Sequence, residues 1–230
     1  MLRRSALSLL LATVAPVSVT AAPSAGKKPT IAILSFDYGG KDAALEPLRE
    51  GLAQMLIADV STIPQVQVVE RARLKALLEE QKLGRSGKLD PATAARVGKL
   101  LGARLLVLGS YFDLGPQLRI DARVVEVETG KILRAVGANG ASGDFWAIEQ
   151  ELAGKLGDVL ADAMTDVAPA RLPARPRPPK VKSTTVATYG QALVALDGGQ
   201  KGQAKTLLAK AVDEAPGFML AKADLNALLQ

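Results

Sequence analysis

The residues of this chain that could do chemistry are mainly carboxylates. The 230-residue sequence contains no histidine and no cysteine. Thiolate nucleophiles, zinc sites of the Cys/His type and the serine–histidine–aspartate triad are therefore excluded. Acidic side chains do occur in close pairs, at Glu79/Glu80, Glu126/Glu128 and Glu149/Glu151. Hydrolysis by carboxylates needs two carboxyl groups that converge in a cleft. The spacing of these pairs does not predict that either member of a pair faces the other across a cleft. The sequence predicts a protein that is not an enzyme and uses no cofactor or metal.

Two glycine-containing segments do not have the pattern of a phosphate site. Gly84 to Lys88 lacks the spacing of a phosphate-binding loop and the hydroxyl that should follow its lysine. Gly137, Gly140 and Gly143 are each three residues apart, which is not the dinucleotide-binding pattern. Neither segment predicts a nucleotide site.

The net charge of +6 does not indicate nucleic-acid binding. Two of the cations, Arg3 and Arg4, lie at the N-terminus, and five lie in residues 167–183. Residues 22–166 hold 18 basic and 19 acidic side chains, so the folded part is nearly neutral.

The N-terminus has the pattern of a secretory signal peptide. The arginine pair precedes the apolar run Ala6–Ala15, and small residues follow up to Ala21. We expect residues 1–21 to be removed and the mature protein to be periplasmic. No later stretch is long and apolar enough to predict a membrane helix.

The periodicity of residues 29–166 predicts one α/β domain. We expect a mixed sheet with a C-terminal antiparallel meander, packed by amphipathic helices. The expected strands are 30–36, 65–69, 105–112, 118–127 and 132–138. The expected helices are 48–60, 71–82, 91–101 and 145–163, and DYGGKD after the first strand is expected to be a loop.

One strand changes its pattern partway along. Apolar residues alternate from Leu118 to Val124 on one face, whereas Val125 and Val127 lie on the other. Either both faces are covered at that end of the sheet, or a bulge shifts the register.

Residues 167–183 are rich in proline and basic side chains, which predicts an extended linker. It is either a solvated spacer or a contact for an acidic partner, anionic lipid headgroups or cell-wall polymer. Residues 184–230 then predict a small all-α tail. Its candidate partner-binding positions, which resemble those of a tetratricopeptide repeat, are Ala192, Ala204, Leu208 and Ala211. A single repeat cannot bury its own face, so the tail should dock on the first domain, pair with another copy or grip a partner. A generic helical hairpin is the alternative.

Several segments carry a family resemblance in their order and spacing. They are IAILSF, VVERARLKALLEEQ, DPATAARVGKLLGARLLVLGSY and LRIDARVVEVETGKIL. Over about residues 29–166 the chain resembles the CsgG family, whose best-known members secrete curli subunits, and is similar to the amino-terminal domain of TolB.

The resemblance implies a role for the segment VVERARL. Glu70 and Arg71 stand where a strand ends and a helix begins, and the family resemblance implies a structural role for this junction. Glu70 should lie near the helix N-terminus, where negative charge is favoured, while Arg71 and Arg73 pair with nearby acids. The alternative is a contact with another protomer or with a ligand.

The chain also departs from the channel members of that family. Those members carry long membrane-crossing insertions in the meander, whereas here only FDLGPQ separates two strands. No cysteine is available to carry a lipid anchor, so we do not expect a lipoprotein.

The sequence therefore predicts a CsgG-like assembly or adaptor module in envelope biogenesis or secretion, without its own transmembrane pore. Its expected partners are proteins of the cell envelope, and the resemblance also implies homo-oligomers. One alternative is a periplasmic sensory module that binds a peptide or a cell-wall ligand, which an exposed apolar groove between the Phe145 helix and the tail would favour. Another is a pore formed together with partner chains.

Overall fold

The computed structural model describes residues 28–80, 91–164 and 180–230. The expected signal peptide 1–21, the loop 84–88 and most of the expected linker 167–183 lie outside the described residues.

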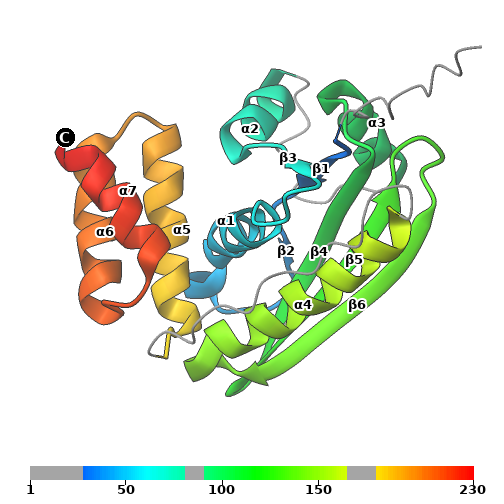
Figure 1. The fold of residues 1–230 in the computed structure, drawn as a ribbon. Helices are drawn as coiled ribbons and strands as arrows, with labels where there is room; N and C mark the ends of the chain where they lie inside the picture. Colours follow the sequence, from blue (N-terminus) through cyan, green and yellow to red (C-terminus); the bar gives the residue numbers. More distant parts are fainter. Residues whose placement is uncertain (1–27, 81–90, 165–179) are drawn as a thin grey trace, which may run out of the picture.

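In the described residues the first domain is built on a six-stranded mixed sheet (Figure 1). The strands are β1 (Thr30–Ile33), β2 (Asp37–Tyr38), β3 (Gln67–Val68), β4 (Leu105–Leu114), β5 (Gln117–Glu126) and β6 (Ile132–Ala141). Their order is β3-β1-β4-β5-β6, with β2 also paired to β4. Pairs among β1 to β4 are parallel, and β4, β5 and β6 form an antiparallel meander. The predicted fold class is confirmed.

Helices cover both faces of the sheet beside β1. The helices are α1 (Leu48–Val60), α2 (Arg71–Glu80), α3 (Pro91–Leu101), α4 (Phe145–Ala163), α5 (Ser183–Asp197), α6 (Lys201–Glu214) and α7 (Met219–Leu229), with short 3₁₀ helices η1 (Ala43–Leu45) and η2 (Ser142–Asp144). Ile31 and Ile33 of β1 join the cluster that includes α1 and α4, whereas Ala32 and Leu34 join the cluster of α2 and α3. This two-sided burial explains the continuous apolar run.

The first strand is shorter than predicted, and the expected DYGGKD loop begins with a strand. Ile33 pairs with Val107 and Asp37 pairs with Ser110, so four steps of chain oppose three steps of β4. The extra residue breaks the ladder between β1 and β2. At this break the ring of Phe36 packs against Gly109. A Cβ atom added to Gly109 would lie 2.4 Å from a carbon of that ring.

The change of pattern in β5 has both of the expected causes. The register between β5 and β6 shifts between Val124 and Val125. Both residues are fully buried, Val124 in the cluster with α1 and α4 and Val125 in the cluster with α2 and α3. The meander's first turn is also as short as predicted, since β4 and β5 are joined by Gly115 (φ 63°) and Pro116 alone.

The tail docks on the first domain, beside α1 (Figure 1). Helices α1 and α5 approach closely at two glycines. A Cβ at Gly190 would lie 1.9 Å from the Pro47 carbonyl oxygen, and one at Gly51 would lie 2.6 Å from the Val186 carbonyl oxygen. One apolar cluster therefore runs from the sheet through α1 into α5, α6 and α7. It includes Val181, at the end of the expected linker.

Candidate functional site

A pocket of about 1050 Å³ lies where α1, α2 and α5 meet the break between β1 and β2. Its lining includes Leu34 and Ser35 from that break and Gly109 from β4 below. The tail supplies the opposite wall through α5 and the start of α6. The docking of the tail and the irregularity at the end of β1 therefore create this pocket together.

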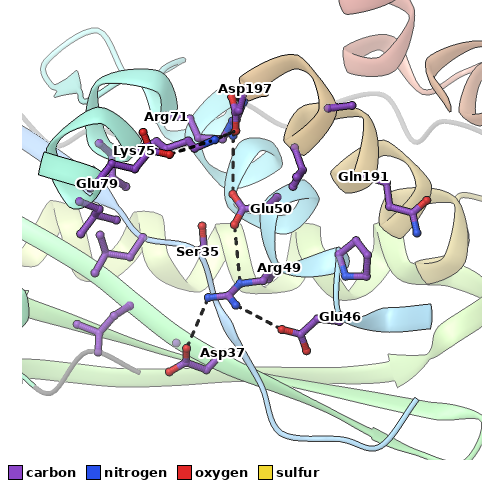
Figure 2. A pocket seen from close by; sticks show the side chains of 18 of the residues that line it. Ser35, Asp37, Glu46, Arg49, Glu50, Arg71, Lys75, Glu79, Gln191 and Asp197 are labelled. Atoms are coloured by element: carbon purple, nitrogen blue, oxygen red, sulfur yellow. Dashed lines mark hydrogen bonds and ion pairs between the residues drawn. The ribbon is translucent and has the colours of Figure 1, made fainter. Parts of the chain in front are cut away.

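Charged side chains line the pocket on both the first-domain side and the tail side (Figure 2). The acidic ones are Asp37, Glu46, Glu50, Glu79 and Asp197, and the basic ones are Arg49, Arg71 and Lys75. Five carboxylates against three cations leave an excess of two negative charges.

Arg71 joins the first domain to the tail. Its guanidinium donates two hydrogen bonds to the carboxylate of Asp197, at 2.6 and 2.7 Å, across 126 residues of sequence. Both side chains are mostly buried, with 12% of Arg71 and 11% of Asp197 exposed. Such two-point pairs are the strongest and most directional ionic contacts in proteins. The pair therefore fixes the end of α5 against the start of α2.

Further ion pairs continue from this contact along the wall. Lys75 approaches Asp197 at 3.3 Å, and Arg71 approaches Glu50 at 3.8 Å. Glu50 in turn lies 3.7 Å from Arg49. Figure 2 shows that Arg71 and Lys75 both point toward Asp197, with Glu50 between Arg71 and Arg49.

The Asp197 carboxyl is held ionised by these neighbours. Burial alone would raise the pKa of Asp197, but hydrogen bonds from Arg71 and the charges of Arg71 and Lys75 leave its pKa below 3.8. A carboxyl whose pKa is lower in the folded state stabilises the fold above its unfolded pKa, and that stabilisation disappears as the pH falls.

We therefore expect the contribution of Asp197 to the free energy of unfolding to be complete above about pH 5 and to be lost as the pH falls below about 4. Urea unfolding of wild type and Asp197→Asn from pH 7 to pH 3 measures it, and the difference between the two proteins should shrink toward pH 3. Asp213→Asn, which changes an exposed carboxyl of α6, is the matched control and should differ little from wild type at any pH. A difference for Asp197→Asn that stays constant with pH would contradict the expectation.

The structure separates the three residues of the predicted strand–helix junction. Arg71 faces the pocket as described, whereas Glu70 and Arg73 are exposed. The Glu70 carbonyl accepts a hydrogen bond from the Leu74 amide at 3.1 Å, at the start of α2.

The four predicted tail positions all lie in the interior. The side chains of Ala192, Ala204, Leu208 and Ala211 have no exposed surface. Small residues here let α5 and α6 pack closely. Any partner of the tail must therefore meet other residues, such as Val194, which lines the pocket and is 52% exposed.

The carboxylate pairs do not converge. Glu149 is fully buried and accepts a hydrogen bond from Gln150 at 2.9 Å, while Glu151 pairs with Lys155 at 2.6 Å on the surface. Glu126 accepts a hydrogen bond from Thr129 in the turn after β5. In the described part of the chain, no three acidic side chains gather in a way that could hold a metal ion.

Sequence reasoning missed most of the pocket. Arg49, Glu50 and Lys75 sit on helices, where such residues usually face water, and Asp197 precedes two glycines that indicate only a turn. The one signal in the sequence was Arg71 itself, for which an acidic partner was expected.

The fold and pocket define an α/β domain with a helical tail docked on it, and a charged pocket between the two. The model of the family "Curli production assembly/transport component CsgG" matches residues 12–119. This match confirms the resemblance to the CsgG family, and residues 12–119 are a CsgG-type segment. The matched segment begins before residue 29, where the resemblance was predicted to start, and ends early in β5.

One curated protein matches over most of the chain. It is the "Putative adenylate cyclase 3" of Rhizobium meliloti (strain 1021), 22% identical over 204 residues. The match covers 89% of this chain but only 33% of that protein. The chain thus spans about a third of the length of the curated relative.

Solved structures share parts of the fold at low identity. The LpoB C-terminal domain from Salmonella enterica has a TM-score of 0.43 and 11% identity, covering 50% of this chain and 83% of that one. The lipoprotein GNA1162 from Neisseria meningitidis has a TM-score of 0.44 and 14% identity, covering 59% of this chain and 98% of that one. TolB from Acinetobacter baumannii has a TM-score of 0.39 and 12% identity, covering 61% of this chain and 29% of that one. At these values the likenesses carry no functional conclusion.

Proposed function

We propose that this chain is a non-enzymatic adaptor module of the cell envelope, which acts in assembly or secretion by binding another polypeptide. The CsgG-type segment supports an envelope role, because the family's description names curli assembly and transport. The signal-peptide pattern of residues 1–21 supports a periplasmic location. Within residues 28–80, 91–164 and 180–230, no helix combines the length and hydropathy that a membrane span needs.

The observation that carries the proposal is the pocket between the α/β domain and the tail. Its two walls come from segments far apart in sequence, held together by the Arg71–Asp197 contact and by the close approach at Gly190. Val194 presents a large apolar side chain there that is 52% exposed. Leu74 and Leu78 also line the pocket, and a concave surface that combines apolar with a few polar side chains is typical of binding sites.

We do not propose cyclase activity. The adenylate cyclase relative is about three times the length of the matching region, so its name describes a protein that this chain covers only in part.

Site-specific photo-crosslinking in intact cells tests the adaptor function. A crosslinking amino acid at Val194 should yield an adduct with one envelope polypeptide, identified by mass spectrometry. The same amino acid at Glu128, an exposed position outside the pocket, is the control and should not yield that adduct. The proposal fails if Val194 gives no polypeptide adduct, or if the full chain fractionates with the cytosol and keeps its leader.

Sedimentation velocity of the mature protein tests the proposed homo-oligomer.

The second candidate function is a periplasmic sensory module that binds a peptide or a cell-wall ligand. The volume of the pocket favours it, because ligand sites commonly measure about 300–1000 Å³. The pocket lies between α2 and α5, however, and none of its described lining comes from α4, where a groove would have favoured this function. Thermal shift against fractionated envelope extract tests this function, and stabilisation by a non-protein fraction would favour it over the adaptor.

A further inference from the structure

The negative charge of the pocket is concentrated at its α1 end. Arg49 lies there among three carboxylates, those of Glu46 at 3.3 Å, Glu50 at 3.7 Å and Asp37 at 3.9 Å. Glu50 is also 3.8 Å from Arg71, and the three carboxylates still outnumber the two guanidinium groups. The Glu46 and Asp37 side chains are 52% and 30% exposed, so a ligand can reach them from solvent. This end should repel anions and attract a cation.

The other end, between α2 and α5, combines balanced charges with apolar surface. Lys75 lies between Asp197 at 3.3 Å and Glu79 at 3.5 Å, so its charge is already answered. Leu78 of α2 and Val194 of α5 also line this part of the pocket. Burying Val194, which is 52% exposed, would remove apolar surface from water.

A ligand that satisfies both ends must carry a cation and apolar groups some distance apart. A small inorganic cation would leave the apolar end uncovered, and an anionic lipid or a nucleic acid would be repelled by the acidic end. At about 1050 Å³ the pocket is large enough for several amino-acid side chains. A polypeptide segment meets these requirements.

We propose that this pocket binds a polypeptide segment in which a lysine or arginine is flanked by apolar side chains. The cation approaches the carboxylates of Glu46 and Asp37 from solvent, alongside Arg49, and an apolar side chain packs on Val194. This inference rests on the proposed adaptor function and specifies the chemistry of its partner.

Fluorescence anisotropy with defined peptides tests the inference on the full mature chain. The probe is a fluorescein-labelled peptide of about ten residues that alternates leucine and lysine, and the matched probes carry glutamate or glutamine in place of lysine. Three protein variants are compared with wild type. They are Asp37→Asn/Glu46→Gln, the charge-matched control Glu128→Gln/Asp213→Asn outside the pocket, and Val194→Arg, which blocks the apolar end.

We expect the lysine peptide to bind at least about tenfold more tightly than the glutamate peptide in low salt, with a smaller ratio near 0.2 M salt. Asp37→Asn/Glu46→Gln should weaken the lysine peptide about fivefold or more, while Glu128→Gln/Asp213→Asn stays within about twofold. Val194→Arg should weaken it as well, and circular dichroism should show that all variants remain folded.

Three results would overturn the inference. If both double variants weaken binding equally, the peptide senses only net charge. If the lysine and glutamate peptides bind equally and Val194→Arg weakens both, the pocket binds polypeptides of another class, and the adaptor function stands without this partner chemistry. If no peptide binds, the inference is wrong, and crosslinking at Val194 decides the adaptor function separately.

Discussion

Replacing Gly190 by leucine should separate the tail from the core and lower the free energy of unfolding by about 3 kcal/mol. A side chain at this position would collide with the carbonyl group of Pro47, whose oxygen lies 1.9 Å from the point that a Cβ atom would occupy. Backbone atoms cannot rotate away, so α1 and α5 must move apart. Urea unfolding followed by the fluorescence of the single tryptophan, Trp146, measures the loss, and hydrogen exchange of the α5 amides reports local undocking.

The matched control is Gly154→Ala, in the middle of α4. A Cβ at Gly154 would meet no atom within 4 Å, so the change should stabilise the protein by about 0.5–1 kcal/mol through helix propensity alone. If Gly190→Leu leaves both the unfolding midpoint and the protection of α5 unchanged, the close packing of α5 on α1 is contradicted.

The second large effect is expected for Arg71→Met. Methionine keeps much of the length of the side chain but removes both hydrogen bonds to Asp197. The Asp197 side chain is 11% exposed, and of its ion pairs described above only the one with Lys75, at 3.3 Å, then remains. Loss of a charged hydrogen-bond partner from a mostly buried group should cost about 2–3 kcal/mol. Urea unfolding measures this cost.

A double-mutant cycle with Asp197→Asn separates the pair from other effects of the substitutions. The double variant should lose less stability than the sum of the two single variants, because a neutral asparagine at this position no longer needs a cationic partner. Arg119→Met is the control, since Arg119 pairs with Asp121 on the surface, where 56% of the arginine side chain is exposed. It should change stability by no more than about 1 kcal/mol. Equal losses for Arg71→Met and Arg119→Met would show that the contact with the tail adds no more stability than a surface ion pair.

Local patterns predicted most of the fold. The alternation along β5 and its change at Val125 indicated either a bulge or two covered faces, and the structure has both. The turn within FDLGPQ and the end of the helix at residue 101 were placed correctly, and Gly115 and Gly102 at these points adopt the positive φ that favours glycine. These features depend on neighbours a few residues away, which sequence spacing records directly.

The pocket could not be predicted in the same way. Arg71 and Asp197 are 126 residues apart, and no periodic pattern connects them. The strand β2 was missed because Asp37 and Tyr38 have the pattern of a polar loop, whereas pairing with Ser110 and Tyr111 holds them in the sheet. In both cases the determining contact is non-local, so it depends on the finished fold.

The apolar cluster that joins the sheet to α7 also sets the order in which the molecule can be completed during synthesis. Its members extend from Ile31 to Ala221, and the side of α1 that packs on α5 has no cover until the tail has emerged. Contacts over such long separations are slow to form, because loop closure must precede them. Until then the chain exposes an apolar helix face, and it should depend on holding chaperones for longer than a domain that ended after α4 would.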